Sequence, residues 1–144
     1  MNISTTIKME NFIQFSFGEI SLELKNDEWK KKYTLPKGWN ELKESRIIAG
    51  QHNRGILTGT VNGITVFDFD SIDVWDKFMK DCEKLGIDLN KYYAVETRRG
   101  FHVYFQYDPD FKTSTNLPCK YGDKNSQIDC RNDGGFITAP PTLS

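Results

Sequence analysis

The chain has 144 residues, 27% of them charged, and a formal net charge of −1. This length fits one domain with its own core, and the balanced charge excludes nucleic-acid binding through a global basic field. Because the sequence has neither a run of 18 apolar residues nor an apolar signal segment, we expect a cytoplasmic protein that is neither secreted nor membrane-spanning.

The first third of the chain predicts strands and a polar loop. Apolar and polar residues alternate on both sides of Gly18, which predicts a hairpin over residues 12–24. Residues 25–39 contain the lysine run 30–32 and are broken by Pro36 and Gly38, so we expect a solvated loop. A short helix is a candidate over residues 40–47.

The middle of the chain predicts two strands followed by a helix. Residues 55–70 form two apolar runs around Asn62-Gly63, a dipeptide typical of hairpin turns. Over residues 71–86, apolar side chains recur at helical spacing. We expect this amphipathic helix to be capped by Asp70 or Ser71 and to end at Gly86.

The last third predicts two further hairpins. Residues 92–107 form two strands around Arg99-Gly100, residues 111–126 form a loop, and residues 127–140 form a hairpin that turns at 133–135. This order predicts an α+β fold, with helices on one face of a mainly antiparallel sheet.

Alternation along the predicted strands sorts polar side chains onto one face. Residues i and i+2 of a strand point the same way, so the apolar face can cover the helix. The opposite, open face is then expected to carry Asp68, Asp70, His102, Asp129 and Arg131.

Three carboxylates on one face indicate a divalent-cation site. Asp68 and Asp70 repel each other unless a cation lies between them, and Mg²⁺ and Mn²⁺ prefer such oxygen ligands. Metals held this way suit nucleotidyl or phosphoryl transfer, although paired aspartates also occur in glycosyltransferases and nucleases. Three cysteines without a CxxC pair give no support for zinc. A triphosphate could be held by His102 together with Arg98, Arg99 or Arg131.

Three blocks of sequence carry a family resemblance. They are NRGILTGTVNGITVFDFD, ETRRGFHVYF and IDCRNDGGFITAPPT, in this order. From about Leu35 to Ser144 the chain resembles the primase–polymerase (prim-pol) branch of the archaeo-eukaryotic primase superfamily. That branch occurs in replication proteins of plasmids, phages and large DNA viruses.

The resemblance implies a function and a site. It implies a template-directed nucleotidyltransferase, a DNA primase or polymerase that acts in replication with two metals, Mg²⁺ or Mn²⁺. Asp68, Asp70 and Asp129 match the metal-binding acids, and His102 matches the histidine that contacts the nucleotide. The partners implied are DNA template and primer, NTP or dNTP, and a helicase domain in the parent protein, with no membrane. The location that the resemblance implies is a prokaryotic cell or a viral replication site.

The resemblance also implies an architecture. An RRM-like antiparallel sheet packed by helices is expected to join a small N-terminal α/β unit, with the site in the cleft between them. Residues 1–144 would form a single prim-pol catalytic domain, an N-terminal fragment of a longer primase–helicase, because relatives run on past the Pro-Pro block. Arg98 and Arg99 occupy a turn where relatives often have small residues.

Two other functions remain open from the residues. One is a catalytically weak module that binds nucleotide or single-stranded DNA, with bases stacked on an aromatic side chain such as Tyr104. The other is a metal-dependent nuclease.

Several candidate residues have ordinary structural explanations. Asp70 would serve as a helix cap and Asp129 as the partner of an arginine in an ion pair. A place in the nucleotide pocket or a plain role in a turn is open for Asn53, Thr58 and Gly59. Arg98 and Arg99 would equally serve as solvated turn residues.

Overall fold

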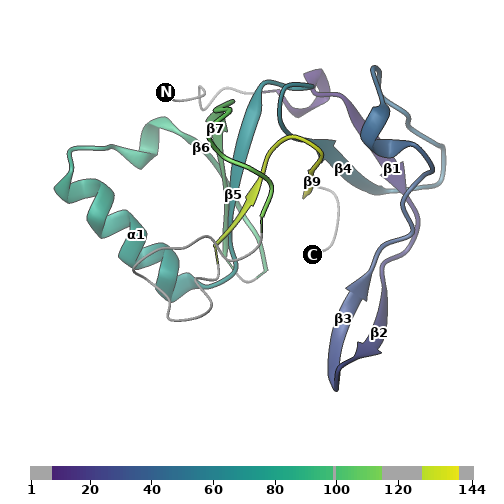
Figure 1. Ribbon diagram of the computed structural model, residues 1–144, viewed down its shortest axis with the longest axis horizontal. Helices are drawn as coiled ribbons and strands as arrows, with labels where there is room; N and C mark the ends of the chain where they lie inside the picture. Colours follow the sequence, from purple (N-terminus) through teal and green to yellow (C-terminus); the bar gives the residue numbers. More distant parts are fainter. Residues whose placement is uncertain (1–7, 99, 115–127, 140–144) are drawn as a thin grey trace.

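The computed structural model describes residues 8–98, 100–114 and 128–139 (Figure 1). Within these residues the strands are β1 (Gln14–Phe17), β2 (Ser21–Lys25), β3 (Glu28–Lys32), β4 (Asn53–Leu57), β5 (Ile64–Phe69), β6 (Tyr93–Glu96), β7 (Phe101–Gln106), β8 (Ile128–Arg131) and β9 (Phe136–Ala139). The α-helix is α1 (Ile72–Lys84), and the 3-10 turns are η1 (Met9–Asn11), η2 (Trp39–Glu41) and η3 (Leu89–Lys91).

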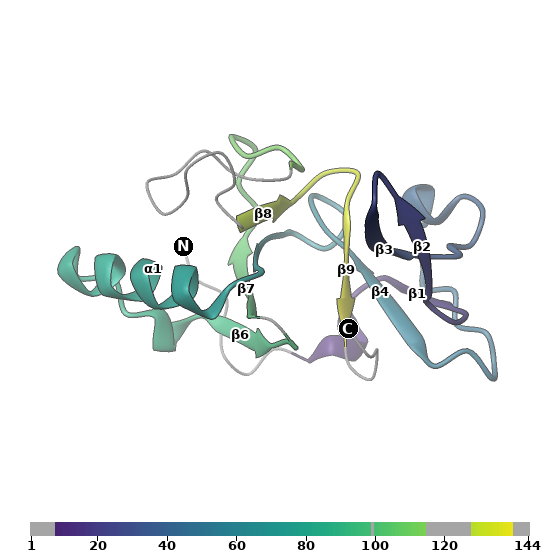
Figure 2. The ribbon, with the colours of Figure 1, turned by 90° about the horizontal axis from the view of Figure 1, so that it is seen from below.

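The strands form three antiparallel sheets. The largest has the order β6-β7-β5-β8, the second has the order β1-β4-β9, and β2 pairs with β3 alone. Helix α1 lies on one side of the four-stranded sheet, and the β1-β4-β9 sheet lies on the other (Figures 1 and 2). The predicted α+β class with an antiparallel sheet packed by a helix is therefore confirmed. No helix in the described parts of the chain is long and apolar enough to cross a membrane.

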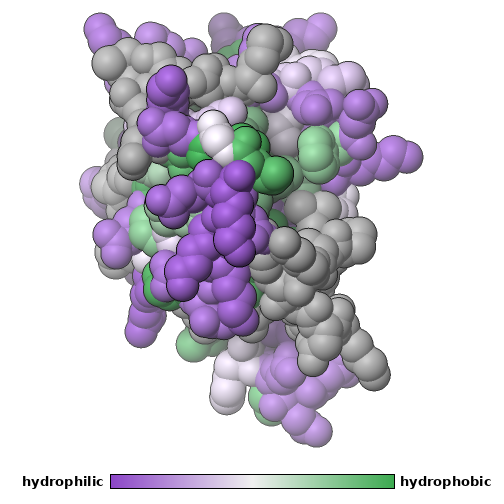
Figure 3. All heavy atoms as spheres, turned by 90° about the vertical axis from the view of Figure 1, so that its left-hand side faces the viewer, coloured by the Kyte–Doolittle hydropathy of each residue, from purple (hydrophilic) through white to green (hydrophobic). Residues whose placement is uncertain are grey.

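The helix forms where the apolar spacing predicts it. The Ser71 hydroxyl accepts a 3.3 Å hydrogen bond from the Val74 amide, so Ser71 is the N-cap residue. Trp75 stacks on Phe101 with ring centroids 4.4 Å apart, which fastens the helix to β7. After Lys84 the chain turns away at Gly86, whose φ of +76° suits glycine. The outer side of α1 is largely hydrophilic (Figure 3).

The face predicted to be open is covered along half its length. Val66 and Tyr104 are fully buried, and they pack against Ile56, Ile137 and Ala139 of the other sheet. The prediction that Tyr104 offers an exposed stacking surface is therefore wrong. The far end of this face, which carries Asp68, stays partly accessible.

Pairing at the N-terminal end differs from the prediction. Strand β1 pairs with β4, and β2 pairs with β3 across a turn at Asn26-Asp27, so residues 12–24 are not a hairpin. Both turn residues have positive φ, 52° and 61°, the conformation of a two-residue hairpin turn. The lysine run 30–32 is therefore in a strand, and of the candidate helix 40–47 only the turn η2 is helical.

Two other predicted hairpins have the right turns but the wrong pairing. Strands β4 and β5 flank Asn62-Gly63 yet enter different sheets, and so do β8 and β9 around Gly134. The reason is that the two connections bond to each other: the Thr58 amide donates to the Gly135 carbonyl at 3.0 Å, and the Thr58 hydroxyl donates to the Asn132 carbonyl at 2.6 Å. These paired crossovers hold the two sheets together.

The β6–β7 hairpin is as predicted. Its strands pair from Tyr93↔Tyr104 to Glu96↔Phe101, and the turn is closed by a 2.9 Å bond from the Thr97 amide to the Gly100 carbonyl. A side chain at Gly100 would collide with the backbone carbonyl of Phe69, so this turn lies against the end of β5. Most of the predicted loop 111–126 falls outside the described residues.

Candidate functional site

Three polar side chains form one row across the four-stranded sheet. Asp68 on β5 is paired with His102 on β7 and with Asp129 on β8. Residues directly opposite each other on antiparallel strands point to the same face, with Cβ atoms about 4.5–5.5 Å apart. Alternation along single strands predicted this shared face, and the register now places the three residues side by side.

Each carboxylate of the row has a cationic or imidazole neighbour. His102 Nε2 lies 3.4 Å from Asp68 Oδ1, an ion-pair contact when the imidazole is protonated. Arg131 Nη2 lies 3.4 Å from Asp129 Oδ2. The side chains of Asp68, Asp129 and Arg131 keep between 25% and 30% of their exposure. These neighbours offset the repulsion between two carboxylates that are adjacent on the sheet.

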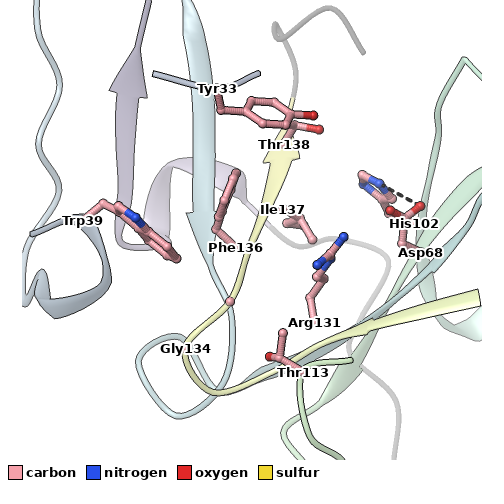
Figure 4. A pocket seen from close by; sticks show the side chains of 11 residues that line it. Tyr33, Trp39, Asp68, His102, Thr113, Arg131, Gly134, Phe136, Ile137 and Thr138 are labelled. Atoms are coloured by element: carbon pink, nitrogen blue, oxygen red, sulfur yellow. Dashed lines mark ion pairs between the residues drawn. The ribbon is translucent and has the colours of Figure 1, made fainter. Parts of the chain in front are cut away.

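Asp68 and His102 of this row line a pocket of about 330 Å³ between the two larger sheets, and Asp129 is not among the residues that line it. Asp68 and His102 form one side of it, and aromatic residues from β9 and from the segment after β3 form the opposite side, with the Arg131 side chain between them (Figure 4). The lining is completed by Thr113 of the loop after β7, by Gly134 and Gly135 of the turn after β8, and by Ile137 and Thr138 of β9.

The aromatic wall consists of Tyr33, Trp39 and Phe136. The rings of Trp39 and Phe136 meet edge to face with centroids 5.0 Å apart, and those of Tyr33 and Phe136 are 6.0 Å apart. Burial raises the pKa of Tyr33, Arg131 opposes this rise and Asp68 adds to it, so the phenol lies within the field of both. Sequence reasoning missed this wall because its residues come from segments that are distant along the chain.

Two further predicted residues, Asp70 and Arg98, are not among the residues that line this pocket. Asp70 is exposed, one residue past the end of β5, and Arg98 is exposed in the β6–β7 turn. Arg99 lies outside the described residues.

The three proposed pocket residues of the β4 region have contacts within the framework. Asn53 donates a 2.7 Å hydrogen bond to the Gly18 carbonyl, and Thr58 is buried in the paired crossovers. Gly59 has a φ of +86°, and a side chain there would collide with Asp133. None of the three lines the pocket.

The adjacent carboxylates of Asp68 and Asp129 supply part of the ligand set that Mg²⁺ or Mn²⁺ needs. These ions are commonly held by one or two carboxylates plus substrate phosphates, and Asp68 and Asp129 supply two adjacent carboxylates. Among the described residues, no three His, Cys, Asp or Glu side chains are grouped to hold an ion. An ion on this pair would therefore need further oxygen ligands from a substrate, or from Asp70 after a change of position.

Comparison with known proteins gives one family. The profile described as "Bifunctional DNA primase/polymerase, N-terminal" (Prim-Pol) matches residues 23–144, which include every strand from β3 to β9 and the whole pocket. Neither a curated protein nor a solved structure matches the chain.

Proposed function

The chain belongs to the prim-pol family of bifunctional DNA primases and polymerases, and we propose that it is a template-directed nucleotidyltransferase whose site is the pocket beside Asp68. The observation that carries the proposal is the row of Asp68, His102 and Asp129. Three sequence blocks that resemble the family's motifs each contribute one residue to it, from three adjacent strands.

The proposed reaction joins a nucleotide to a growing strand. The 3′-hydroxyl of a primer, or of a first nucleotide, attacks the α-phosphorus of a bound NTP or dNTP. A new phosphodiester bond forms, the bond between the α- and β-phosphates breaks, pyrophosphate leaves and the hydroxyl proton passes to solvent. Mg²⁺ or Mn²⁺ held by Asp68, Asp70 and Asp129 would activate the hydroxyl and neutralise the phosphates.

Arg131 and His102 are the proposed triphosphate ligands. Both line the pocket, and the planar guanidinium of Arg131 suits bidentate contact with phosphate. Arg131 is paired with Asp129 at 3.4 Å. Nucleotide binding in our proposal moves Arg131 from the carboxylate to the triphosphate, which frees Asp129 to act as a ligand.

The aromatic wall is the proposed surface for the base or sugar of the nucleotide. Tyr33, Trp39 and Phe136 lie across the pocket from Asp68 (Figure 4). Aromatic rings accept any base by stacking, which suits an enzyme whose template chooses the nucleotide. In the wider proposal the domain acts on DNA template and primer in replication, beside a helicase domain in the parent protein.

The test is nucleotide incorporation on a primed and an unprimed single-stranded template with Mn²⁺. We expect Asp68→Asn to lower the rate at least about a hundredfold, as loss of a transition-state contact does. The matched control is Asp73→Asn, which removes an exposed carboxylate on α1 that pairs only at the surface with Lys77. Equal rates for wild type and Asp68→Asn would refute the proposed site.

A second candidate is a nucleotide-binding or single-stranded-DNA-binding module without strong catalysis. The observation that favours it is that Asp68 and Asp129 already lie within 3.4 Å of His102 and Arg131. Such a module would bind nucleotide equally well with and without Mn²⁺. An enzyme of the kind proposed would show a strict requirement for the ion.

A further inference from the structure

Two hydroxyl groups in the pocket are not used by the fold. The side chains of Tyr33 and Thr138 both line the pocket. Among the described residues, no hydrogen bond joins either hydroxyl to another group of the protein. The Thr113 hydroxyl differs, because it donates to the Asp133 carbonyl and accepts from the Asn132 amide. The hydroxyls of Tyr33 and Thr138 can therefore each offer a donor and an acceptor to a ligand.

The Tyr33 ring is held in place by two aromatic neighbours. It meets Phe17 edge to face with ring centroids 5.9 Å apart, and it meets Phe136 with centroids 6.0 Å apart. Its hydroxyl end points across the pocket, toward the side formed by Asp68 and His102 (Figure 4). Burial raises the pKa of this phenol above its usual value, so the hydroxyl keeps its proton at neutral pH and can donate.

Thr138 lies next to the aromatic wall on strand β9. Phe136 and Thr138 are two residues apart on this strand, so their side chains share a face. The residue opposite Thr138 on β4 is Gly55, where a side chain would collide with the Phe15 ring, so Thr138 has no polar side chain across the strand pair. Because the Tyr33 ring meets Phe136, the hydroxyls of Tyr33 and Thr138 lie at one end of the pocket (Figure 4).

A nucleotide bound as proposed places its sugar beside these two hydroxyls. In the proposed function Arg131 and His102 hold the triphosphate, and rings of the aromatic wall hold the base. The sugar of a nucleotide joins its base to its phosphates. Because the Arg131 side chain lies between Asp68 and the aromatic wall, the sugar falls at the near side of the wall, where Tyr33 and Thr138 are (Figure 4).

On the basis of the proposed function, we propose that Tyr33 and Thr138 bind the 2′- and 3′-hydroxyls of the sugar, so that the pocket selects ribonucleotides over deoxyribonucleotides. Neutral hydroxyls suit the hydroxyls of a sugar, because each partner can both donate and accept. A ribose offers two adjacent hydroxyls. A deoxyribose offers one and leaves a protein hydroxyl in the pocket without its partner. Sites that hydrogen-bond a substrate hydroxyl discriminate against an analogue that lacks it.

The test is calorimetric titration of ATP, 2′-deoxy-ATP and 3′-deoxy-ATP into the full chain with Mn²⁺. We expect ATP to bind at least about tenfold more tightly than either deoxy form. Tyr33→Phe and Thr138→Val each remove one hydroxyl and change the volume little, and the double variant should reduce the preference for ATP to about twofold or less. The matched control is Tyr92→Phe, which removes a phenol hydroxyl beside the core on the helix side of the four-stranded sheet and should leave the preference unchanged.

The preference between nucleotides decides the outcome, because a variant that only distorts the fold would weaken binding of all three alike. Equal or tighter binding of 2′-deoxy-ATP by the wild type would overturn the selection of ribonucleotides, and an unchanged preference in the double variant would overturn the roles of Tyr33 and Thr138. Both results leave the proposed function standing, because Asp68→Asn tests incorporation separately. Incorporation by Asp68→Asn at the wild-type rate would refute the proposed function alone, whereas no binding of any of the three nucleotides would overturn both.

Discussion

Replacing Asn132 with alanine should remove the connection between the paired crossovers and the loop after β7. Asn132 is fully buried. Its side-chain oxygen accepts a 3.0 Å hydrogen bond from the Thr65 hydroxyl, and its amide donates to the carbonyls of Asp108 at 2.8 Å and Phe111 at 2.7 Å. Alanine would remove the hydrogen bonds that the Thr65 hydroxyl and the carbonyls of Asp108 and Phe111 make with this side chain.

The expected cost follows from the number of bonds. Each buried hydrogen bond contributes about 1 kcal/mol, and partners left unsatisfied cost more, so Asn132→Ala should lower the free energy of unfolding by about 3–4 kcal/mol. Asn53→Ala is the matched control, because the half-buried Asn53 side chain makes one 2.7 Å bond, to the Gly18 carbonyl. That variant should lose about 1 kcal/mol.

Urea unfolding followed by far-ultraviolet circular dichroism measures both changes. A loss of about 3 kcal/mol lowers the urea midpoint by about 1–3 M at typical slopes, whereas the Asn53 variant should shift less than half as far. Equal losses in the two variants would refute the reasoning, because they would show that the crossover network around Asn132 does not hold the sheets together.

Two further predictions concern the turns next to the site. Gly100→Ala would bring a side chain against the Phe69 carbonyl and should lower the free energy of unfolding by about 3 kcal/mol. Gly134→Ala should cost about a third as much, because the space there is open and only the φ of +75° opposes the change. Melting temperatures of the two variants measure the difference, and equal shifts would contradict it. The Tyr107 hydroxyl donates a 2.6 Å bond to Asp133 and lowers the pKa of that carboxyl below its usual value. The stabilisation from this bond is therefore complete above the unfolded-state pKa and is lost as pH falls through the lower folded-state pKa. The difference in unfolding free energy between wild type and Tyr107→Phe should therefore shrink in acid, and a constant difference would argue against the bond.

The sequence predicted the faces of the strands better than their partners. Alternation placed Asp68, His102 and Asp129 on one side, because the period of a strand is two wherever the strand pairs. Pairing depends on contacts that are distant along the chain. The chain does turn at Asn62-Gly63, but Asn62 lacks the positive φ of a two-residue Asn-Gly turn, and the Gly63 amide instead donates to the Gly59 carbonyl. Because Thr58 bonds to the second crossover, the strands on either side of this turn enter different sheets.

The pocket, too, could be predicted from the sequence only in part. Its polar side could be predicted from three motifs, whereas its aromatic wall could not, because Tyr33, Trp39 and Phe136 meet only after the second sheet folds over the first. The β2–β3 hairpin was missed for a different reason. Its lysines suggested a solvated loop. The sequence signal for a turn between two strands was the dipeptide Asn26-Asp27, and both residues have positive φ in the structure.

The most direct test of the proposed site is calorimetric titration of dATP and of ATP into the protein, with and without Mn²⁺. Wild type and Asp73→Ala should bind nucleotide only when Mn²⁺ is present, and Asp68→Ala should lose this binding. Binding that is indifferent to both Mn²⁺ and the Asp68 substitution would contradict a polymerase-type site in this pocket, and the binding-module alternative would then explain the molecule better.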